Sequence, residues 1–456
     1  MSKDKPDIIA KMRTLISETV NHVGELAIVE GWVHLRRDHG KLIFLSLRDR
    51  SGMLQIVVNA NVSEDAYKAV KDVKPEFAVK IKGIVKKRPD NAVDKSSIAG
   101  SVELEAKEII ILAKAETLPF DMGGKNLNLE LPTLLDNRGL TLRHPKIASI
   151  FKVQETLIDS FRQACKKKGF TEYQSPVIIP QGAEGGSEVF EIKYFNHKAY
   201  LAQSPQFYKQ IMVGVFERVF SVNKTLRAEP SVTTRHLTEV TTLDVEFGFI
   251  ESWFDVIDMA EYVIKFMIES INDQNADILK THNVSIPKMA AKIPQLKLRE
   301  AQEIIFKRTG RDNRQDPDLQ PEDEREICKW ALENKGSDLV FVTHYPVSKR
   351  PFYTFEDTED PGYTLSFDLI GQGTEWLTGG QRINDYNKLV QNAKKRGIDL
   401  EKSEIYLQAF RYGMPPEGGF SFGSERITMN ILGLKNVREA SLFPRDMERV
   451  DERFSH

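Results

Sequence analysis

The sequence predicts an α+β protein in which a small N-terminal β-barrel precedes a larger antiparallel sheet with flanking helices. Three observations lead to this prediction. At 456 residues the chain is longer than one ordinary domain. Short β-branched runs, separated by turn signals, fill residues 1–113. From residue 145 to the C-terminus, strand-like runs alternate with loops and helical patterns, which is typical of an α+β domain.

The first 113 residues are predicted to form five strands and one helix. Turns rich in Asp and Gly separate these elements: strands at 26–34, 42–47, 53–58, 77–85 and 102–112, and a helix at 63–71. Three strands, a helix and two strands match the OB-fold, a barrel whose open face binds single-stranded nucleic acid or oligosaccharide. We therefore expect a nucleic-acid-binding domain at the N-terminus.

The open face of such a barrel combines aromatic rings with cations. Four side chains are the candidates for this face: Trp32, His34, Arg36 and Phe44. The alternative is that Trp32 and Phe44 belong to the barrel core and that the nearby lysines form a solvated edge. Residues 1–110 carry a small excess of Lys and Arg over Asp and Glu, which permits RNA binding without proving it.

Residues 114–144 lack sustained periodicity and collect Pro, Gly and Asn, so they are predicted to be a hinge between domains. Residues 145–456 form the second predicted domain. A long amphipathic helix is expected at 146–168. Strand candidates follow at 219–223, 242–249, 339–343, 366–369 and 404–409. Residues 251–336 are expected to be a helical periphery, with helices at 254–272, 297–309 and 323–334.

Composition narrows the class of protein. Hydrophobic residues make up 41% of the chain and charged residues 29%, with a net charge of −2, which is ordinary for a globular protein. Cys165 and Cys328 are too few for a disulfide framework or a zinc site, and this favours a reducing compartment. The N-terminus lacks an apolar signal core, and no stretch is long enough to cross a membrane. We expect a cytoplasmic protein that does not bind membranes.

Three segments carry the candidate chemistry: residues 167–178, 226–247 and 418–429. The second and third hold charged and glycine residues at close spacing: Arg227, Glu229, Arg235, His236, Gly423, Glu425 and Arg426. The planar fork of arginine matches pairs of phosphate oxygens, and carboxylates hold the Mg²⁺ that travels with a nucleotide. Together the segments predict a site for a nucleoside triphosphate and its metal.

These three segments resemble motifs 1, 2 and 3 of the class II aminoacyl-tRNA synthetases. An OB-fold ahead of such a domain resembles the subgroup that serves aspartate, asparagine and lysine. Longer stretches resemble the aspartyl-tRNA synthetases of archaeal and eukaryotic type: EGGSEVFEIKYF (184–195), AQSPQFYKQ (202–210), TTRHLTE (233–239), FDLIGQGTEWLTGGQRI (367–383) and YGMPPEGGF (412–420). The resemblance implies ATP-dependent activation of L-aspartate to aspartyl-adenylate and its transfer to the 3′ end of tRNA(Asp). It also implies Mg²⁺ and a homodimer formed through motif 1.

The resemblance assigns a role to each motif residue. Arg227 is expected to bridge the substrate carboxylate and the α-phosphate, and Arg426 to stack on adenine or hold the γ-phosphate. These two and Glu375, which would carry Mg²⁺ with Thr378 and Asp368 beside it, form the expected catalytic set. The expected ATP-binding set is wider: Arg227, Glu229, Arg235, His236, Leu237, Glu375, Gly423, Ser424, Glu425 and Arg426.

A second set is expected to select the amino acid. Lys209 and Arg382 would hold the β-carboxylate of aspartate. Glu184 and Gln206 would receive the α-ammonium group or orient its neighbours. Arg227, at the substrate carboxylate, and Thr378 complete the expected aspartate-binding set. Three alternatives stay open, namely that Lys209 is a solvated helix lysine, that the chain is an asparaginyl-tRNA synthetase, and that it is a catalytically silent tRNA-binding paralogue.

Some positions depart from the family pattern. Pro230-Ser231-Val232, Ser421, Ser424 and Asn384 replace usual family residues, and they bear on tRNA handling and ATP affinity. His34 stands where enzymes that charge only tRNA(Asp) tend to have tryptophan. A smaller donor–acceptor ring could tolerate either C or U as the last anticodon base. The hypothesis is therefore a non-discriminating enzyme that also aspartylates tRNA(Asn).

Overall fold

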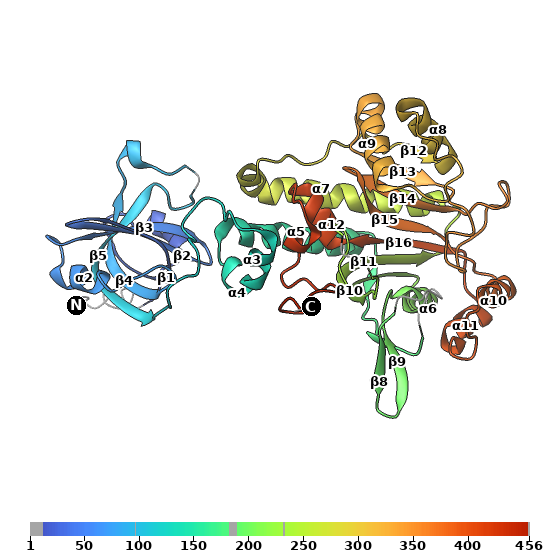
Figure 1. Ribbon diagram of the computed structural model, residues 1–456, viewed down its shortest axis with the longest axis horizontal. Helices are drawn as coiled ribbons and strands as arrows, with labels where there is room; N and C mark the ends of the chain where they lie inside the picture. The colour runs from blue at the N-terminus through green and yellow to red at the C-terminus, as the bar shows by residue number, and fades with distance from the viewer. Residues whose placement is uncertain (1–11, 96, 182–188, 231–232, 455–456) are drawn as a thin grey trace, which may run out of the picture. The chain divides into compact units, whose positions relative to one another are not determined.

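The computed structural model of the chain describes residues 12–95, 97–181, 189–230 and 233–454. The chain divides into two compact units, with the boundary between Glu130 and Leu131. Figure 1 shows a barrel in the first unit and a sheet with helices in the second. The predicted fold class is confirmed.

The first unit is a closed barrel with the strand order β1-β2-β3-β5-β4. Its elements are η1 (Ile16–Asn21), β1 (Leu26–His39), β2 (Leu42–Asp49), β3 (Gly52–Asn59), α2 (Glu64–Val70), β4 (Ala78–Lys87), η2 (Asp90–Ala92) and β5 (Val102–Ala113). Alternate residues of the strands point inward, so Val29, Leu45, Ile56 and Val79 are fully buried in one core. The predicted order of three strands, a helix and two strands is confirmed, and the two 3₁₀ helices were not predicted.

The second unit is built on an eight-stranded sheet with the order β12-β13-β14-β15-β16-β11-β10-β6. The strands are β6 (Thr171–Glu172), β10 (Arg218–Leu226), β11 (Glu239–Gly248), β12 (Gln295–Lys297), β13 (Leu339–Thr343), β14 (Ser366–Gly371), β15 (Thr374–Gln381) and β16 (Glu417–Gly423). Neighbours pair antiparallel, except that β6 and β12 run parallel to β10 and β13. A separate three-stranded sheet has the order β7 (Ile178–Ile179), β9 (His197–Leu201), β8 (Glu191–Tyr194).

The second unit also contains helices, some of which pack on the sheet. They are α3 (Leu131–Asp136), α4 (Arg138–Thr141), α5 (Pro145–Lys167), α6 (Gln206–Phe216), α7 (Phe254–His282), α8 (Leu298–Thr309), α9 (Pro321–Lys335), α10 (Tyr386–Lys395), α11 (Glu404–Arg411), α12 (Ser424–Ile431) and the 3₁₀ turn η3 (Val437–Ala440). Apolar residues of α5 and α7 share one core with the sheet residues Phe220, Val245 and Phe420. Among the described residues, no helix combines the length and apolar composition that a membrane crossing needs.

One predicted strand is wrong. Residues 404–409 belong to helix α11, although Ile405, Leu407 and Ala409 alternate as they would in a strand. The structure instead buries Tyr406, Leu407 and Phe410, which is helical spacing, and leaves Ile405 73% exposed. Because the segment has only six residues, its apolar pattern could not distinguish the two-residue period of a strand from the 3.6-residue period of a helix.

The predicted hinge also differs from the structure. Residues 131–144 hold α3 and α4 and lie in the second unit, whereas residues 114–130 contain neither helix nor strand. Arg138 explains the order of this segment, because its buried guanidinium donates to the carbonyl oxygens of Leu442, Glu439 and Ser441 at 2.8, 3.1 and 2.6 Å. Partners about three hundred residues away leave no local signal in the sequence.

Candidate active site

A cavity of about 450 Å³ opens on the face of the sheet opposite α5 and α7, and β11, β15, β16 and α6 contribute to its walls. Most of the predicted site residues line it: Gln206, Lys209, Arg227, Glu229, Arg235, His236, Leu237, Glu375, Thr378, Arg382, Gly423, Glu425 and Arg426. Segments more than two hundred residues apart in the chain therefore meet at one cavity.

Two of the predicted residues that the structure describes are not among those that line the cavity. Ser424 is fully buried at the start of α12. Asp368 is buried on β14, where it pairs across the strands with Thr378 of β15. Glu184 lies outside the described residues, as do Ser231 and Val232 of the departing triplet.

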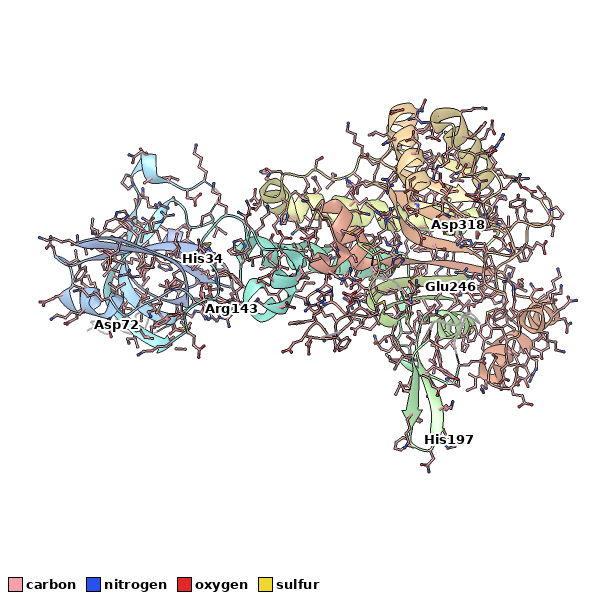
Figure 2. All side chains as sticks on the ribbon, viewed as in Figure 1. His34, Asp72, Arg143, His197, Glu246 and Asp318 are labelled. Carbon is pink, nitrogen blue, oxygen red and sulfur yellow. The ribbon has the colours of Figure 1, made fainter. Side chains whose placement is uncertain are left out.

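Strand alternation explains why charged residues face the cavity. On β11, Leu243, Val245 and Phe247 enter the apolar core, so Asp244 and Glu246 point to the opposite side. Figure 2 labels Glu246 within the sheet of the second unit. Both acids are almost completely buried, and a buried carboxylate needs a partner.

Those partners are the two predicted aspartate-binding cations. Lys209 Nζ lies 3.1 Å from Glu246 Oε2 and 3.3 Å from Asp244 Oδ1. Arg382 Nε lies 2.8 Å from Glu246 Oε1, and its Nη2 donates to the Gly419 carbonyl at 3.0 Å. The side chain of Lys209 is 2% exposed, so the alternative of a solvated helix lysine is wrong.

Glycine on β16 makes room for this arrangement. Gly419 pairs with Glu246 across the sheet, and a Cβ atom at Gly419 would lie 2.1 Å from the Val245 carbonyl oxygen and 2.2 Å from Glu246 Oε2. A larger residue would therefore displace the carboxylate that both cations share. At Gly423 the same atom would meet only Arg426 Cβ, at 3.9 Å, so that side of the strand opens into space.

At the other end of the cavity the charged side chains are more exposed to solvent, and Arg227 is more loosely paired. The Arg227 side chain is 45% exposed, and its Nη1 lies 3.8 Å from Glu229 Oε1. Arg235 Nη1 lies 2.6 Å from Glu324 Oε2, and its Nη2 donates to the Gly373 carbonyl at 2.8 Å. Arginine side chains can swing from such partners to an entering anion.

His236 lies among these arginines. Its Nδ1 is 2.6 Å from Thr233 Oγ1, and its Nε2 is 3.8 Å from Glu229 Oε2. Burial lowers the pKa of His236, and the neighbouring arginine charges lower it further against the opposing effect of Glu229. The lowered pKa favours the neutral ring at neutral pH.

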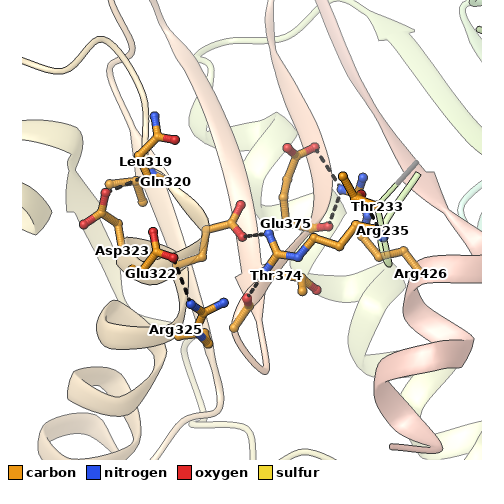
Figure 3. Close-up of polar contacts among 12 residues, drawn as sticks. Thr233, Arg235, Leu319, Gln320, Glu322, Asp323, Arg325, Thr374, Glu375 and Arg426 are labelled. Atoms are coloured by element: carbon orange, nitrogen blue, oxygen red, sulfur yellow. Dashed lines mark hydrogen bonds and ion pairs between the residues drawn. The ribbon is translucent and has the colours of Figure 1, made fainter. Parts of the chain in front are cut away.

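Carboxylates and arginines also meet on β14 and β15. Figure 3 shows Arg235 and Arg426 beside Glu375, and Arg426 Nη1 donates to the Glu375 carbonyl at 2.8 Å. Partial burial in the cavity and the neighbouring Asp368 carboxylate raise the pKa of Glu375 to about 7. Asp368 Oδ2 lies 2.8 Å from Arg350 Nη2, while its buried Oδ1 has no hydrogen-bond partner among the described residues.

Sequence reasoning missed three residues at this site. Arg350 lines the cavity, lies over the Tyr345 ring at 3.9 Å and donates to Thr378 Oγ1 at 3.1 Å, yet its loop carries no periodic signal. Asp244 and Glu246 did leave a signal. Two acids spaced two residues apart inside an apolar strand predict buried charges that require cations.

The Glu425 carboxylate is already hydrogen-bonded to neighbouring groups of the protein. Its carboxylate accepts hydrogen bonds from the Thr241 backbone N–H at 3.1 and 3.0 Å and from Ser424 Oγ at 3.0 Å. These contacts tie the start of α12 to β11. Its predicted role toward ATP stays a prediction.

The barrel residues divide into exposed and buried ones. Trp32 is 42% exposed with the Arg48 guanidinium over its ring at 5.4 Å, so the alternative that Trp32 is barrel core is wrong. Phe44 is half-buried, and Arg36 lies 2.8 Å from Asp38. His34 is 6% exposed at a shift in the β1–β2 register, and it lines a cavity of about 390 Å³. His34 therefore faces a hollow within the first unit rather than bulk solvent.

The chain is similar to known proteins along nearly its whole length. Residues 130–447 match the family described as tRNA synthetases class II (D, K and N), and residues 27–112 match OB-fold nucleic acid binding domains. An aspartate–tRNA(Asp/Asn) ligase of Thermus thermophilus is 41% identical over 96% of this chain and 100% of that protein. An aspartate–tRNA(Asp) ligase of Pyrococcus abyssi is 37% identical over 95% and 98%. The crystal structure of asparaginyl-tRNA synthetase from Pyrococcus horikoshii complexed with asparaginyl-adenylate matches with a TM-score of 0.86 at 30% identity, over 96% of this chain and 99% of that chain.

Proposed function

Because the chain belongs to the class II tRNA synthetases of the D, K and N group, it joins an amino acid to tRNA, and we propose that this amino acid is L-aspartate. The observation that carries the proposal is the pair of buried cations, Lys209 and Arg382, held on the single carboxylate of Glu246. Fixed cations at the inner end of the cavity suit an anionic side chain.

The same pair argues against asparagine. The carboxylate of aspartate would give these buried cations a further anionic partner, whereas the neutral amide of asparagine would not, so the site disfavours asparagine. The asparaginyl-tRNA synthetase alternative has support from the similar structure that bears that name. ATP–pyrophosphate exchange with each amino acid separates the two. Exchange with asparagine at a rate equal to or above that with aspartate would overturn the aspartate proposal.

The proposed reaction has two steps. An oxygen of the aspartate α-carboxylate attacks the α-phosphorus of ATP, the bond to the β-phosphate oxygen breaks, and pyrophosphate leaves. A hydroxyl of the terminal tRNA ribose then attacks the carbonyl carbon of the adenylate, and AMP leaves. Two anions must meet in the first step, so Arg227 acts by lying between carboxylate and phosphate and offsetting their repulsion. Glu229, Arg235, His236 and Arg426 position the rest of the nucleotide.

Mg²⁺ is proposed to accompany ATP at Glu375, with Asp368 and Thr378 beside it. The residues fit this ion. Among the described residues no three His, Cys, Asp or Glu side chains gather as a closed metal centre would need. Mg²⁺ instead uses one or two carboxylates together with water and phosphate oxygens. The buried Asp368 Oδ1, which has no hydrogen-bond partner in the described part of the chain, favours a cation here. When bound, the ion withdraws charge from the phosphates.

We further propose that the enzyme charges tRNA(Asn) as well as tRNA(Asp). The support is His34 on the barrel, whose small ring lines a cavity with room beside it, and one of the two relatives named above is an Asp/Asn ligase. The other relative is an Asp ligase, so the relatives do not decide the matter. Aspartylation of two transcripts that differ only in their anticodons, GUC and GUU, tests it. A preference of a hundredfold or more for GUC would contradict the proposal.

Three wider expectations complete the proposal. A homodimer through motif 1 is expected, and a monomer at micromolar concentration in sedimentation would contradict it.

The catalytically silent paralogue is disfavoured, because Arg227, Glu375 and Arg426 are all present at the cavity. Absence of exchange with any amino acid in the wild type would restore that alternative. A cytoplasmic location stays a prediction from composition.

A further inference from the structure

A third acidic side chain lies behind the two cations of the amino-acid end. Glu417, the first residue of β16, is fully buried and is not among the residues that line the cavity. Its Oε1 accepts a hydrogen bond from Gln210 Nε2 at 2.7 Å, and Gln210 Oε1 accepts from the Tyr406 hydroxyl at 3.1 Å. Its Oε2 has no hydrogen-bond partner among the described residues. The backbone carbonyl of Glu417 accepts from the Arg382 N–H at 2.9 Å.

This carboxyl group belongs to a compact set of charges from four parts of the fold. Strand β11 brings Asp244 and Glu246, α6 brings Lys209, the segment after β15 brings Arg382, and β16 brings Glu417. If every member were ionised, three negative charges would face two positive ones. An excess negative charge behind the cations would oppose the entry of an anionic side chain, and burying it unpaired costs several kcal/mol.

The surroundings of Glu417 favour its neutral form. Burial is the main cause, and the nearby Glu246 carboxylate adds to it, so the pKa of Glu417 is raised well above its ordinary value. The hydrogen bond from Gln210 and the charges of Arg382 and Lys209 act in the opposite direction. Tyr406, which ends the chain of hydrogen bonds, is also buried with a raised pKa and remains a donor.

We propose that Glu417 is a positioning residue that stays protonated and thereby keeps this buried set neutral, so that Lys209 and Arg382, already paired with Glu246, can also receive the side-chain carboxylate of aspartate. This inference rests on the proposed function. Glu417 acts through Gln210, Tyr406 and Arg382 and does not touch the substrate.

The proposal has a defined pH dependence. The acid is neutral below its raised pKa, so aspartate binding should not change with the ionisation of Glu417 in that range. Above that pKa Glu417 ionises, and the KM for aspartate rises by about tenfold per pH unit for a single proton. The glutamine of E417Q imitates the neutral acid and cannot ionise, so its KM should not show this rise.

The experiment is ATP–pyrophosphate exchange from pH 7 to pH 10 with wild type and E417Q, with the KM for ATP as the internal control. At pH 7 we expect kcat and the KM for aspartate of E417Q to stay within about threefold of wild type. At high pH the wild-type KM for aspartate should exceed that of E417Q by tenfold or more. The α-ammonium group of aspartate titrates equally in both series of measurements. The test therefore uses only the difference between the wild-type and E417Q values of the KM for aspartate at each pH. Coincident profiles, or a hundredfold loss of aspartate binding in E417Q at pH 7, would overturn the proposal.

An infrared spectrum keeps the test independent of enzyme activity. At pH 8, with ¹³C-labelled glutamate, the wild type should show the carbonyl band of a buried neutral carboxylic acid, and E417Q or E417D should lack it. Absence of any band that these substitutions remove would overturn the proposal. If the wild type shows no aspartate-dependent exchange, the proposed function fails, while the infrared band still reports the state of Glu417.

Discussion

The two ends of the cavity are built in different ways. At the proposed amino-acid end, Lys209 and Arg382 are almost fully buried and already paired with Glu246. At the proposed nucleotide end, the Arg227 side chain is 45% exposed and its Nη1 lies 3.8 Å from Glu229 Oε1. A buried ion pair fixes geometry and resists the wrong substrate, whereas an exposed one contributes little to stability and can change partners. We infer that substrate selectivity depends on the buried ion pairs, whereas catalysis depends on exposed arginines that can change partners. Substitutions at the two ends should therefore differ in what they damage.

The largest effect is expected from Lys209→Met. It removes one cation of a buried set, so Asp244 loses its cationic partner and Glu246 keeps only Arg382, which costs about 3–5 kcal/mol in unfolding free energy. The kcat/KM for aspartate should fall roughly 10²- to 10³-fold. Urea unfolding and exchange kinetics measure the two losses. Lys224→Met is the matched control, because Lys224 is 53% exposed with Glu239 at 3.5 Å. An effect on stability no larger than that of the control would contradict the comparison.

Arg227→Ala should separate chemistry from stability at the nucleotide end. Loss of a group that acts in the transition state should lower kcat by about 10²-fold or more, with the unfolding free energy within about 0.5 kcal/mol of wild type. Single-turnover formation of the adenylate is the measurement. A stability loss as large as that of Lys209→Met would show that both ends are built alike.

Two glycines on β16 provide a matched pair. In Gly419→Ala the new Cβ would strike Glu246 Oε2 and the Val245 carbonyl, so stability and the KM for aspartate should both worsen, the latter by about tenfold. In Gly423→Ala the new atom meets only Arg426 Cβ at 3.9 Å, so the fold should be unchanged and only the KM for ATP should respond. Thermal unfolding measures the stability of each variant, and exchange kinetics measure its KM values for aspartate and ATP. Equal destabilisation by the two substitutions is the result that would count against this account.

The smallest effect concerns pH. The folded pKa of His236 is lowered, so its protonation opposes folding, and this cost appears as the pH falls below the ordinary histidine value of about 6.5. His236→Gln should therefore lose slightly less Tm than wild type between pH 7 and pH 5. Scanning calorimetry at several pH values measures the two slopes. A steeper slope in the variant would mean that the histidine gains a negative partner on folding.

How much the sequence could predict depends on how local each signal is. Barrel strands were found because alternation and turns lie within a few residues, as along Leu26–His39. The residues that meet at the cavity could be predicted because their motifs are contiguous, whereas the ion pairs between them could not. Nothing near Lys209 in the chain indicates Glu246, since strand order alone brings β11 beside α6. Arg350 lies in an irregular loop, which has no periodic pattern to predict it. The apolar pattern of Ile405–Ala409 fits both the period of a strand and that of a helix.

Strand β16 has a consequence for the making of the protein. It ends at Gly423, only 33 residues before the last residue, His456, yet it lies in the sheet between β15 and β11. During synthesis the N-terminal barrel can close while the ribosome is still translating, because all its strands precede residue 114. The sheet of the second unit cannot, since a gap stays between β15 and β11 until β16 has been synthesised. Nascent chains should therefore expose that gap to chaperones until β16 has left the ribosome, and a message truncated before codon 417 should yield a folded barrel attached to an unfinished sheet.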